Sequence, residues 1–120
     1  MSIAADPVDD TLQRGINYKV EGLYDEAIAQ FQIILIEDPC HAHARMELGL
    51  VYGFLGLFDE SIEELQNAAS LAPGCPKIRL NLAKTYCMLG MNDEARSEFE
   101  EVLAREPENE EALKNLSFLT

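Results

Sequence analysis

Apolar and polar positions follow the period of a helix along this chain, in pairs of segments separated by a glycine. Leu48 and Tyr52 recur one turn apart before Gly56, and Ile62 and Leu65 do so after it. Because residues three or four apart share one face of a helix, this pattern predicts two amphipathic helices joined by a short turn.

Capping residues mark where these helices begin and end. Gly56 is expected to close the first helix in a left-handed conformation, and Asp59 to cap the second. Asp25 and Asp93 hold the position of Asp59 in the neighbouring segments. Further expected caps are Asp6 before Pro7, Cys75 before Pro76 and Asn109 before a final helix.

The whole pattern repeats with a period of 34 residues. Six columns align without gaps: Gly15, Gly49 and Ala83; Tyr18, Tyr52 and Tyr86; Gly22, Gly56 and Gly90; Ala27, Ser61 and Ala95; Phe31, Leu65 and Phe99; Pro39, Pro73 and Pro107. A fixed period of this length indicates stacked helical hairpins. We therefore predict one domain over residues 1–120, with units at about 8–41, 42–75 and 76–109 and a capping helix over 110–120.

The aligned columns also predict how the helices pack. Small residues at 15, 49 and 83 allow a neighbouring helix to approach closely, and those at 27, 61 and 95 fit against larger side chains. One hairpin alone buries too little apolar surface, whereas three stacked units form a continuous core.

These residues and their spacing resemble the tetratricopeptide repeat family over almost the whole chain. The departures are Thr11, Arg45 and Arg79 in a tryptophan column, and Arg14 where leucine is expected. We interpret Arg14 as a sign that the first hairpin is partly solvated. The resemblance implies an all-α, right-handed solenoid whose first helices line a concave face. It also implies that the usual activity is binding of peptides and proteins, without catalysis.

A second, largely apolar arc runs along the first helix of each unit, more than a quarter-turn away from the arc expected to pack inside. In the family this arc faces the ligand, so it predicts a hydrophobic groove made of Leu12, Ile16, Val20, Met46, Leu50, Phe54, Leu80, Lys84 and Met88. Such a groove suits an apolar or amphipathic peptide segment. The alternative is that these side chains belong to the core, covered by the second helices.

A subset of the family binds the C-terminal carboxylates of chaperones through Lys, Asn and Arg side chains. The corresponding residues here are Leu12, Ile16, Glu47, Lys77 and Asn81, of which only Lys77 matches. Because Glu47 would repel a carboxylate, the sequence argues against this specialised activity.

Catalytic and metal-binding patterns are weak. Paired carboxylates such as Glu63 and Glu64 fit solvated helix faces, and no phosphate-binding glycine loop occurs. Cys40, His41 and His43 lie close together in a turn, with Cys75 one unit later in the column of His41. The spacing of neighbouring units, roughly 10 Å, is too wide for one ion. We therefore expect no metal or cofactor, and no enzyme activity.

Charge narrows the classes of partner. The chain carries 22 acidic against 9 basic residues, a net charge of −13, which repels nucleic acid and anionic lipid. No apolar stretch is long enough to cross a membrane, so we expect no membrane insertion. Three cysteines, an odd number, fit reduced thiols in a cytoplasmic protein.

The sequence thus predicts an acidic, cytoplasmic adaptor or chaperone-like module that binds a protein or peptide. Two other functions stay open. The first is a self-assembling unit, a homo-oligomer in which another copy closes the groove. The second is a subdomain of an enzyme, which the lack of convergent polar groups disfavours.

Overall fold

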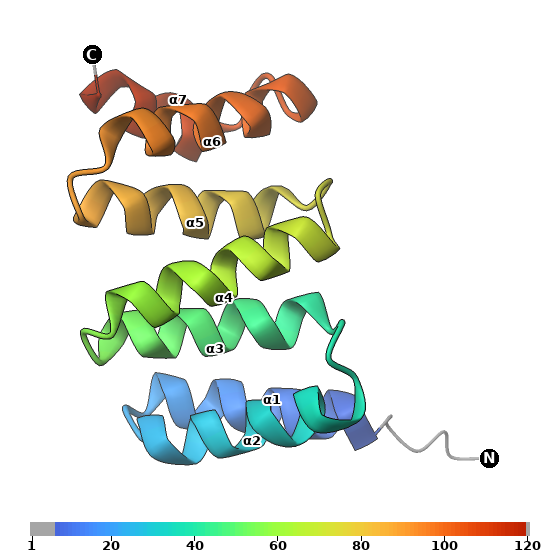
Figure 1. The fold of residues 1–120 in the computed structure, drawn as a ribbon. Helices are drawn as coiled ribbons and strands as arrows, with labels where there is room; N and C mark the ends of the chain where they lie inside the picture. Colours follow the sequence, from blue (N-terminus) through green and yellow to red (C-terminus); the bar gives the residue numbers. More distant parts are fainter. Residues whose placement is uncertain (1–6, 120) are drawn as a thin grey trace.

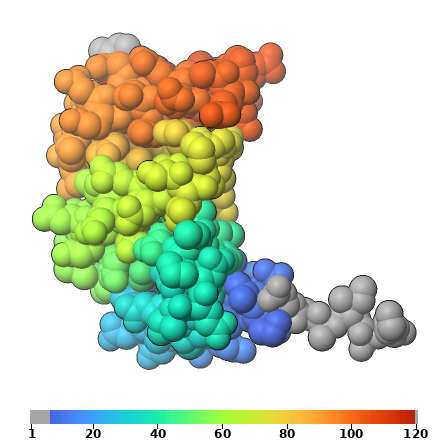
Figure 2. Space-filling model, turned by 45° about the vertical axis from the view of Figure 1, so that its right-hand side comes forward, coloured from blue at the N-terminus to red at the C-terminus, as the bar shows by residue number. Residues whose placement is uncertain are grey.

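A computed structural model describes residues 7–119, which form seven helices and no strand. The helices are α1 (Pro7–Val20), α2 (Tyr24–Glu37), α3 (Ala42–Phe54), α4 (Phe58–Leu71), α5 (Pro76–Met88), α6 (Asn92–Arg105) and α7 (Glu110–Phe118). They stack in chain order as three antiparallel hairpins with α7 at the far end (Figure 1). The surface view shows the same order as successive bands of colour (Figure 2). The predicted helical solenoid is confirmed.

Glycine turns join the two helices of each unit, as predicted. Gly22, Gly56 and Gly90 have φ values of 79°, 78° and 74°, the left-handed region that glycine adopts without strain. In unit two, the amide of Leu57 donates to the carbonyl oxygen of Tyr52 at 2.9 Å, which satisfies an orphan carbonyl at the helix end. The equivalent bonds recur in units one and three.

The predicted aspartate caps of the second helices are wrong. These helices begin after Leu23, Leu57 and Met91, none of which makes a side-chain capping bond. Asp25, Asp59 and Asp93 instead lie within the first turn. There a carboxylate still interacts favourably with the positive end of the helix dipole. The tight glycine turn already fixes the entry of the chain, so no capping side chain is required.

Caps elsewhere follow the usual chemistry. The side chain of Asn109 accepts a bond from the amide of Ala112 at 2.9 Å, which confirms the predicted start of α7. His41 caps α3 through Nδ1, which accepts from the amide of Ala44 at 3.0 Å. Cys75 precedes α5 without a side-chain capping bond. The expected cap at Asp6 lies outside the described residues.

The close crossing of the two helices in each hairpin is confirmed. A Cβ atom at Gly15 would lie 2.5 Å from Cε1 of Phe31, well inside van der Waals contact. In unit two the hydroxyl of Ser61 donates to the carbonyl oxygen of Gly49 at 2.7 Å. Ala27 and Ala95, which share the column of Ser61, are fully buried. Small residues therefore set the distance between the paired helices.

Two arginines occupy the positions of units two and three at which the family often has tryptophan. Arg45 pairs with Glu64 at 3.0 Å and donates to the carbonyl oxygen of Pro39 at 2.8 Å. Arg79 repeats both contacts one unit later, to Glu98 and to the carbonyl oxygen of Pro73. Each guanidinium thus links its own second helix to the loop from the preceding unit, a role that the sequence did not reveal.

The ends of the stack differ in character. Arg14 is exposed at the end formed by α1, as its unusual position predicted, and donates to the side chain of Gln30. At the other end, Ala112, Leu116 and Leu119 of the α7 region pack on the core of unit three. Among the described helices, none combines the length and the apolar character needed to span a bilayer.

Candidate functional site

The nine residues of the predicted groove form three rows across the stack. Because the chain reverses at each turn, α1, α3 and α5 run in the same direction, and α3 contacts both of the others. Residues 34 positions apart therefore occupy equivalent places on neighbouring helices. Each row takes one residue from each of these helices.

The first row is buried. Leu12 and Leu80 are 9% exposed, and Met46 is 1% exposed. These side chains pack in the core between units, as the alternative interpretation of the arc expected. Leu80 and Met46 also form the floors of two surface clefts.

The second row is half-buried. Ile16 packs against the core of units one and two, and Leu50 is partly covered. Lys84 is the charged member of this row, and its Nζ pairs with the carboxylate of Glu111 of α7 at 2.7 Å.

The third row, at the ends of the first helices, is exposed and apolar. Val20, Phe54 and Met88 keep 78%, 61% and 66% of their surface accessible. The ring of Phe54 stacks on Tyr24 of unit one, with centroids 5.7 Å apart. We call Val20, Phe54 and Met88 the exposed row. Leu23, Leu57 and Met91 in the adjoining turns are also exposed and extend it.

A buried charge cluster joins units one and two. The carboxylate of Glu47 pairs with the ammonium group of Lys19, and Nε2 of His43 lies 3.7 Å from its other oxygen. Burial raises the pKa of Glu47, but His43 and Lys19 more than offset this effect, so its pKa lies below the usual value. The Glu47 side chain is 4% exposed, so its charge is neutralised inside the fold rather than presented to a ligand.

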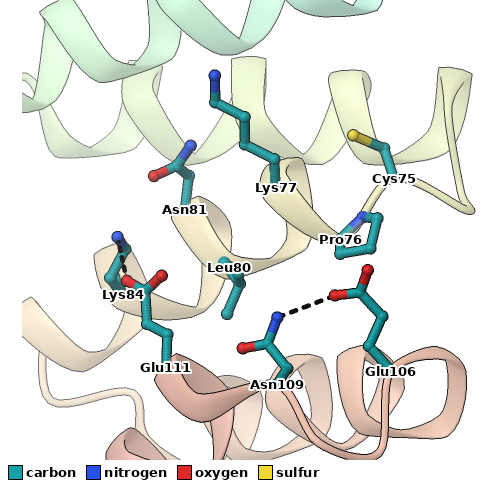
Figure 3. Close-up of a pocket in the computed structure, with 9 residues that line it drawn as sticks. All are labelled: Cys75, Pro76, Lys77, Leu80, Asn81, Lys84, Glu106, Asn109 and Glu111. Carbon is teal, nitrogen blue, oxygen red and sulfur yellow. Dashed lines mark hydrogen bonds and ion pairs between the residues drawn. The ribbon is translucent and has the colours of Figure 1, made fainter.

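A cleft of about 460 Å³ opens between α5 and α7 (Figure 3). Lys77, Asn81 and Lys84 reach it from α5, and Glu111 from α7. On the same side as Glu111, the side-chain amide of Asn109 donates to the carboxylate of Glu106 at 2.9 Å. Lys77 takes part in no ion pair within residues 7–119. The cleft is therefore the polar end of the surface formed by the first helices.

Only Leu80 and Lys84 of this cleft were among the predicted site residues. Lys77 and Asn81 occupy positions at which the carboxylate-binding members of the family carry basic residues, and Glu111 belongs to the capping helix. Glu111 lies 34 residues after Lys77. Extending the repeat register into the capping helix would have placed it on this surface.

Charge is distributed unevenly between the two layers of helices. Every lysine of the chain lies on a first helix or on α7. By contrast, α2 and α4 carry acidic residues and no basic one. The outer surfaces of α2 and α4 therefore carry acidic residues without a basic residue from the same helix, unlike that of α6, which also carries Arg96 and Arg105.

The cysteine and histidine residues of the first turn are spread among separate roles. Cys40 is exposed, His41 caps α3, and His43 faces Glu47. Within residues 7–119, no three side chains of the metal-binding types lie close enough together to hold an ion.

Comparisons with known proteins agree with this architecture. Two family profiles, both described as tetratricopeptide repeat, match residues 12–74 and 55–117. No curated protein matches the chain by sequence.

Several solved structures share the fold. The first TPR of Spaghetti (RPAP3), bound to the HSP90 peptide SRMEEVD, is 24% identical with a TM-score of 0.87, covering 98% of this chain and 93% of that chain. The second TPR domain of human RPAP3, in complex with the HSP70 peptide SGPTIEEVD, is 26% identical with a TM-score of 0.82, and the match covers 91% of each chain. MamA is 23% identical with a TM-score of 0.85, covering 94% of this chain and 66% of that one.

The two profile matches together span nearly the whole described chain, with the turns, small-residue crossings and stacked hairpins that the fold requires. The chain belongs to the tetratricopeptide repeat family.

Proposed function

We propose that this protein is a non-catalytic interaction module that binds a polypeptide segment by its apolar side chains. One observation carries the proposal. Large apolar residues occupy the same position in all three units and remain mostly exposed, as Val20, Phe54 and Met88. Leaving such side chains in water is unfavourable, and a ligand that covers them recovers that free energy.

The chemistry of the exposed row favours an apolar or amphipathic segment. Fully burying a side chain of this size contributes roughly 1.5–3 kcal/mol, so the row can anchor a peptide in spite of the entropy lost on binding. Phe54 occupies the central unit, where an anchor is most completely desolvated. Met88 is flexible and adapts to side chains of different shape.

Related structures support peptide binding, whereas the residues of this chain favour a different class of peptide. The two RPAP3 domains hold acidic chaperone peptides. Here Leu12 and Ile16 cannot donate hydrogen bonds to a carboxylate, and Glu47 is buried in its ion pair with Lys19. Lys77 in the cleft is left to receive a single polar or acidic group of the bound segment, whereas the side-chain amide of Asn81 already donates to the sulfur of Met46.

The test is a binding titration with a fluorescent amphipathic peptide that has a leucine face and uncharged polar residues. Replacing Phe54→Ser and Met88→Ser together should weaken its binding by at least about tenfold, because two anchors are lost. Both side chains are exposed, so the melting temperature should be unchanged. The matched control replaces Ile33→Asn and Ile36→Ser, two exposed residues on the outer side of α2, and should bind normally.

Two results would count against the proposal. Equal binding by the Phe54 and Met88 variant and the wild type would exclude the exposed row as the site. The second is a mass that doubles at high protein concentration in light scattering but stays that of a monomer in the Phe54 and Met88 variant. This result would show that another copy of the chain covers the exposed row. The protein would then be a self-assembling unit.

A further inference from the structure

The second helix of unit one is apolar on two opposite sides. Ala27, Phe31 and Ile34 face the core and are buried. On the other side, Ile33 and Ile36 are 51% and 80% exposed, and Ala29, one turn earlier, is also exposed. The spacing of residues 29, 33 and 36 places them on one face of α2. We call these three residues the outer face of α2.

The fold does not require apolar residues at these positions. The equivalent residues are Glu63, Asn67 and Ser70 in unit two, and Ser97, Glu101 and Ala104 in unit three. All six are exposed. Unit two has a neighbouring unit on both sides, and its outer face is still uncovered. A further unit stacked before α1 would therefore leave Ile33 and Ile36 exposed as well.

Acidic residues flank this apolar face at both ends of the helix. Asp25 and Glu26 lie in the first turn of α2, and Glu37 is its last residue, followed by Asp38. The helix carries no lysine or arginine. Asp25, Glu26 and Glu37 belong to no ion pair within the described part of the chain. Their charges are therefore available to a partner.

The charge decides between the possible occupants. A second copy of this chain would bring the same acidic residues and a net charge of −13 against the same face, so like charges would oppose the contact. A basic partner would pair with these carboxylates. The apolar segment from residue 29 to 36 is roughly 10 Å long, and the acidic ends are roughly 18 Å apart, from the rise of 1.5 Å per helical residue.

We propose that the outer face of α2 docks a basic amphipathic helix of another protein. Its apolar stripe packs on Ile33 and Ile36, and lysine or arginine residues at its two ends pair with the acids at the ends of α2. This surface is separate from the exposed row, which lies on the first helices and in the turns. The protein thus has a second interaction surface, which binds a basic partner, whereas the exposed row binds an apolar or amphipathic segment.

The experiment uses two fluorescent helical peptides with the same apolar stripe, one flanked by lysines and the other by glutamates. In the Phe54→Ser and Met88→Ser variant, whose exposed row has lost two anchors, the lysine peptide should still bind, more weakly as salt is added, and the glutamate peptide should not. Replacing Ile33→Asn and Ile36→Ser as well gives these two positions of the outer face of α2 the residues of unit two. Lysine-peptide binding should fall by at least about tenfold, with an unchanged melting temperature.

A second variant tests the charges without altering the apolar residues. Replacing Glu26→Gln and Glu37→Gln should also weaken binding of the lysine peptide and reduce its salt dependence. The Phe54 and Met88 variant should keep the salt-dependent preference for the lysine peptide over the glutamate peptide, which separates this surface from the exposed row. Failure of the lysine peptide to bind, equal affinity for the two peptides, or a dimer that the Ile33 and Ile36 variant dissociates would each overturn the proposal.

Discussion

Replacing Gly15 by alanine should destabilise the fold, although alanine is the better helix former. The new Cβ atom would lie 2.5 Å from Cε1 and 2.9 Å from Cζ of Phe31. Phe31 is completely buried, so its ring has no free space into which to move. Overpacking of this kind costs about 1–3 kcal/mol, whereas the change from glycine to alanine in a helix gains about 0.5–1 kcal/mol. The expected net loss, the difference between the middles of these ranges, is about 1 kcal/mol.

Gly53 provides the matched control, because it lies in a helix with more space around it. A Cβ atom there would lie 3.3 Å from the nearest atom, the hydroxyl oxygen of Ser61. Gly53→Ala should therefore be less destabilising than Gly15→Ala, because its new Cβ is less crowded and helix propensity offsets up to about 1 kcal/mol. Unit three already carries alanine at the position of Gly15, as Ala83. The effect of the substitution is thus a matter of local spacing rather than of backbone conformation.

Urea denaturation followed by far-ultraviolet circular dichroism measures both variants against the wild type. The free energy of unfolding of Gly15→Ala should lie below that of the wild type and below that of Gly53→Ala. A Gly15→Ala protein as stable as the wild type would refute the reasoning. It would show that α1 and α2 can separate, or that Phe31 can turn, at negligible cost.

Two further predictions concern charge. The pKa of Glu47 is lower in the folded protein than its usual value of 4.5. The ionised Glu47 carboxylate therefore contributes its full stabilisation above pH 4.5, and this contribution is lost as the pH falls through the folded-state pKa. The Glu47→Gln variant should accordingly lose less stability on acidification than the wild type. Urea denaturation from about pH 6 to about pH 3 checks this, and parallel stability profiles would contradict it. A peptide with an acidic chaperone C-terminus should show no measurable binding in calorimetry, because Leu12 and Ile16 lack the donors that a carboxylate needs. Micromolar affinity that requires the free carboxylate would contradict the second prediction.

The sequence by itself determined the repeat, the helices and the turns of this protein. A glycine such as Gly56 is the residue best suited to a left-handed turn, and a small residue at Gly15 or Ala27 is needed wherever two helices cross closely. These constraints act through local geometry or through one neighbouring helix, and they recur every 34 residues. The threefold register made them recognisable.

Tertiary structure decided which apolar residues reach the surface. Leu12 and Val20 belong to the same predicted arc of α1, yet Leu12 is buried and Val20 is mostly exposed. Periodicity gives the direction of a side chain around its helix, but its burial depends on the neighbouring helices at that height. Those neighbours are distant in sequence.

The same reason applies to charge. Glu47 in isolation predicts repulsion of an anion, but the fold brings Lys19 to its carboxylate from a helix in the preceding unit. On α2, the sequence shows Ile33 and Ile36, and only the packing shows that no described helix covers them. The pattern of residues therefore determined the architecture. The surfaces available to partners depend on contacts between units, which only the three-dimensional arrangement contains.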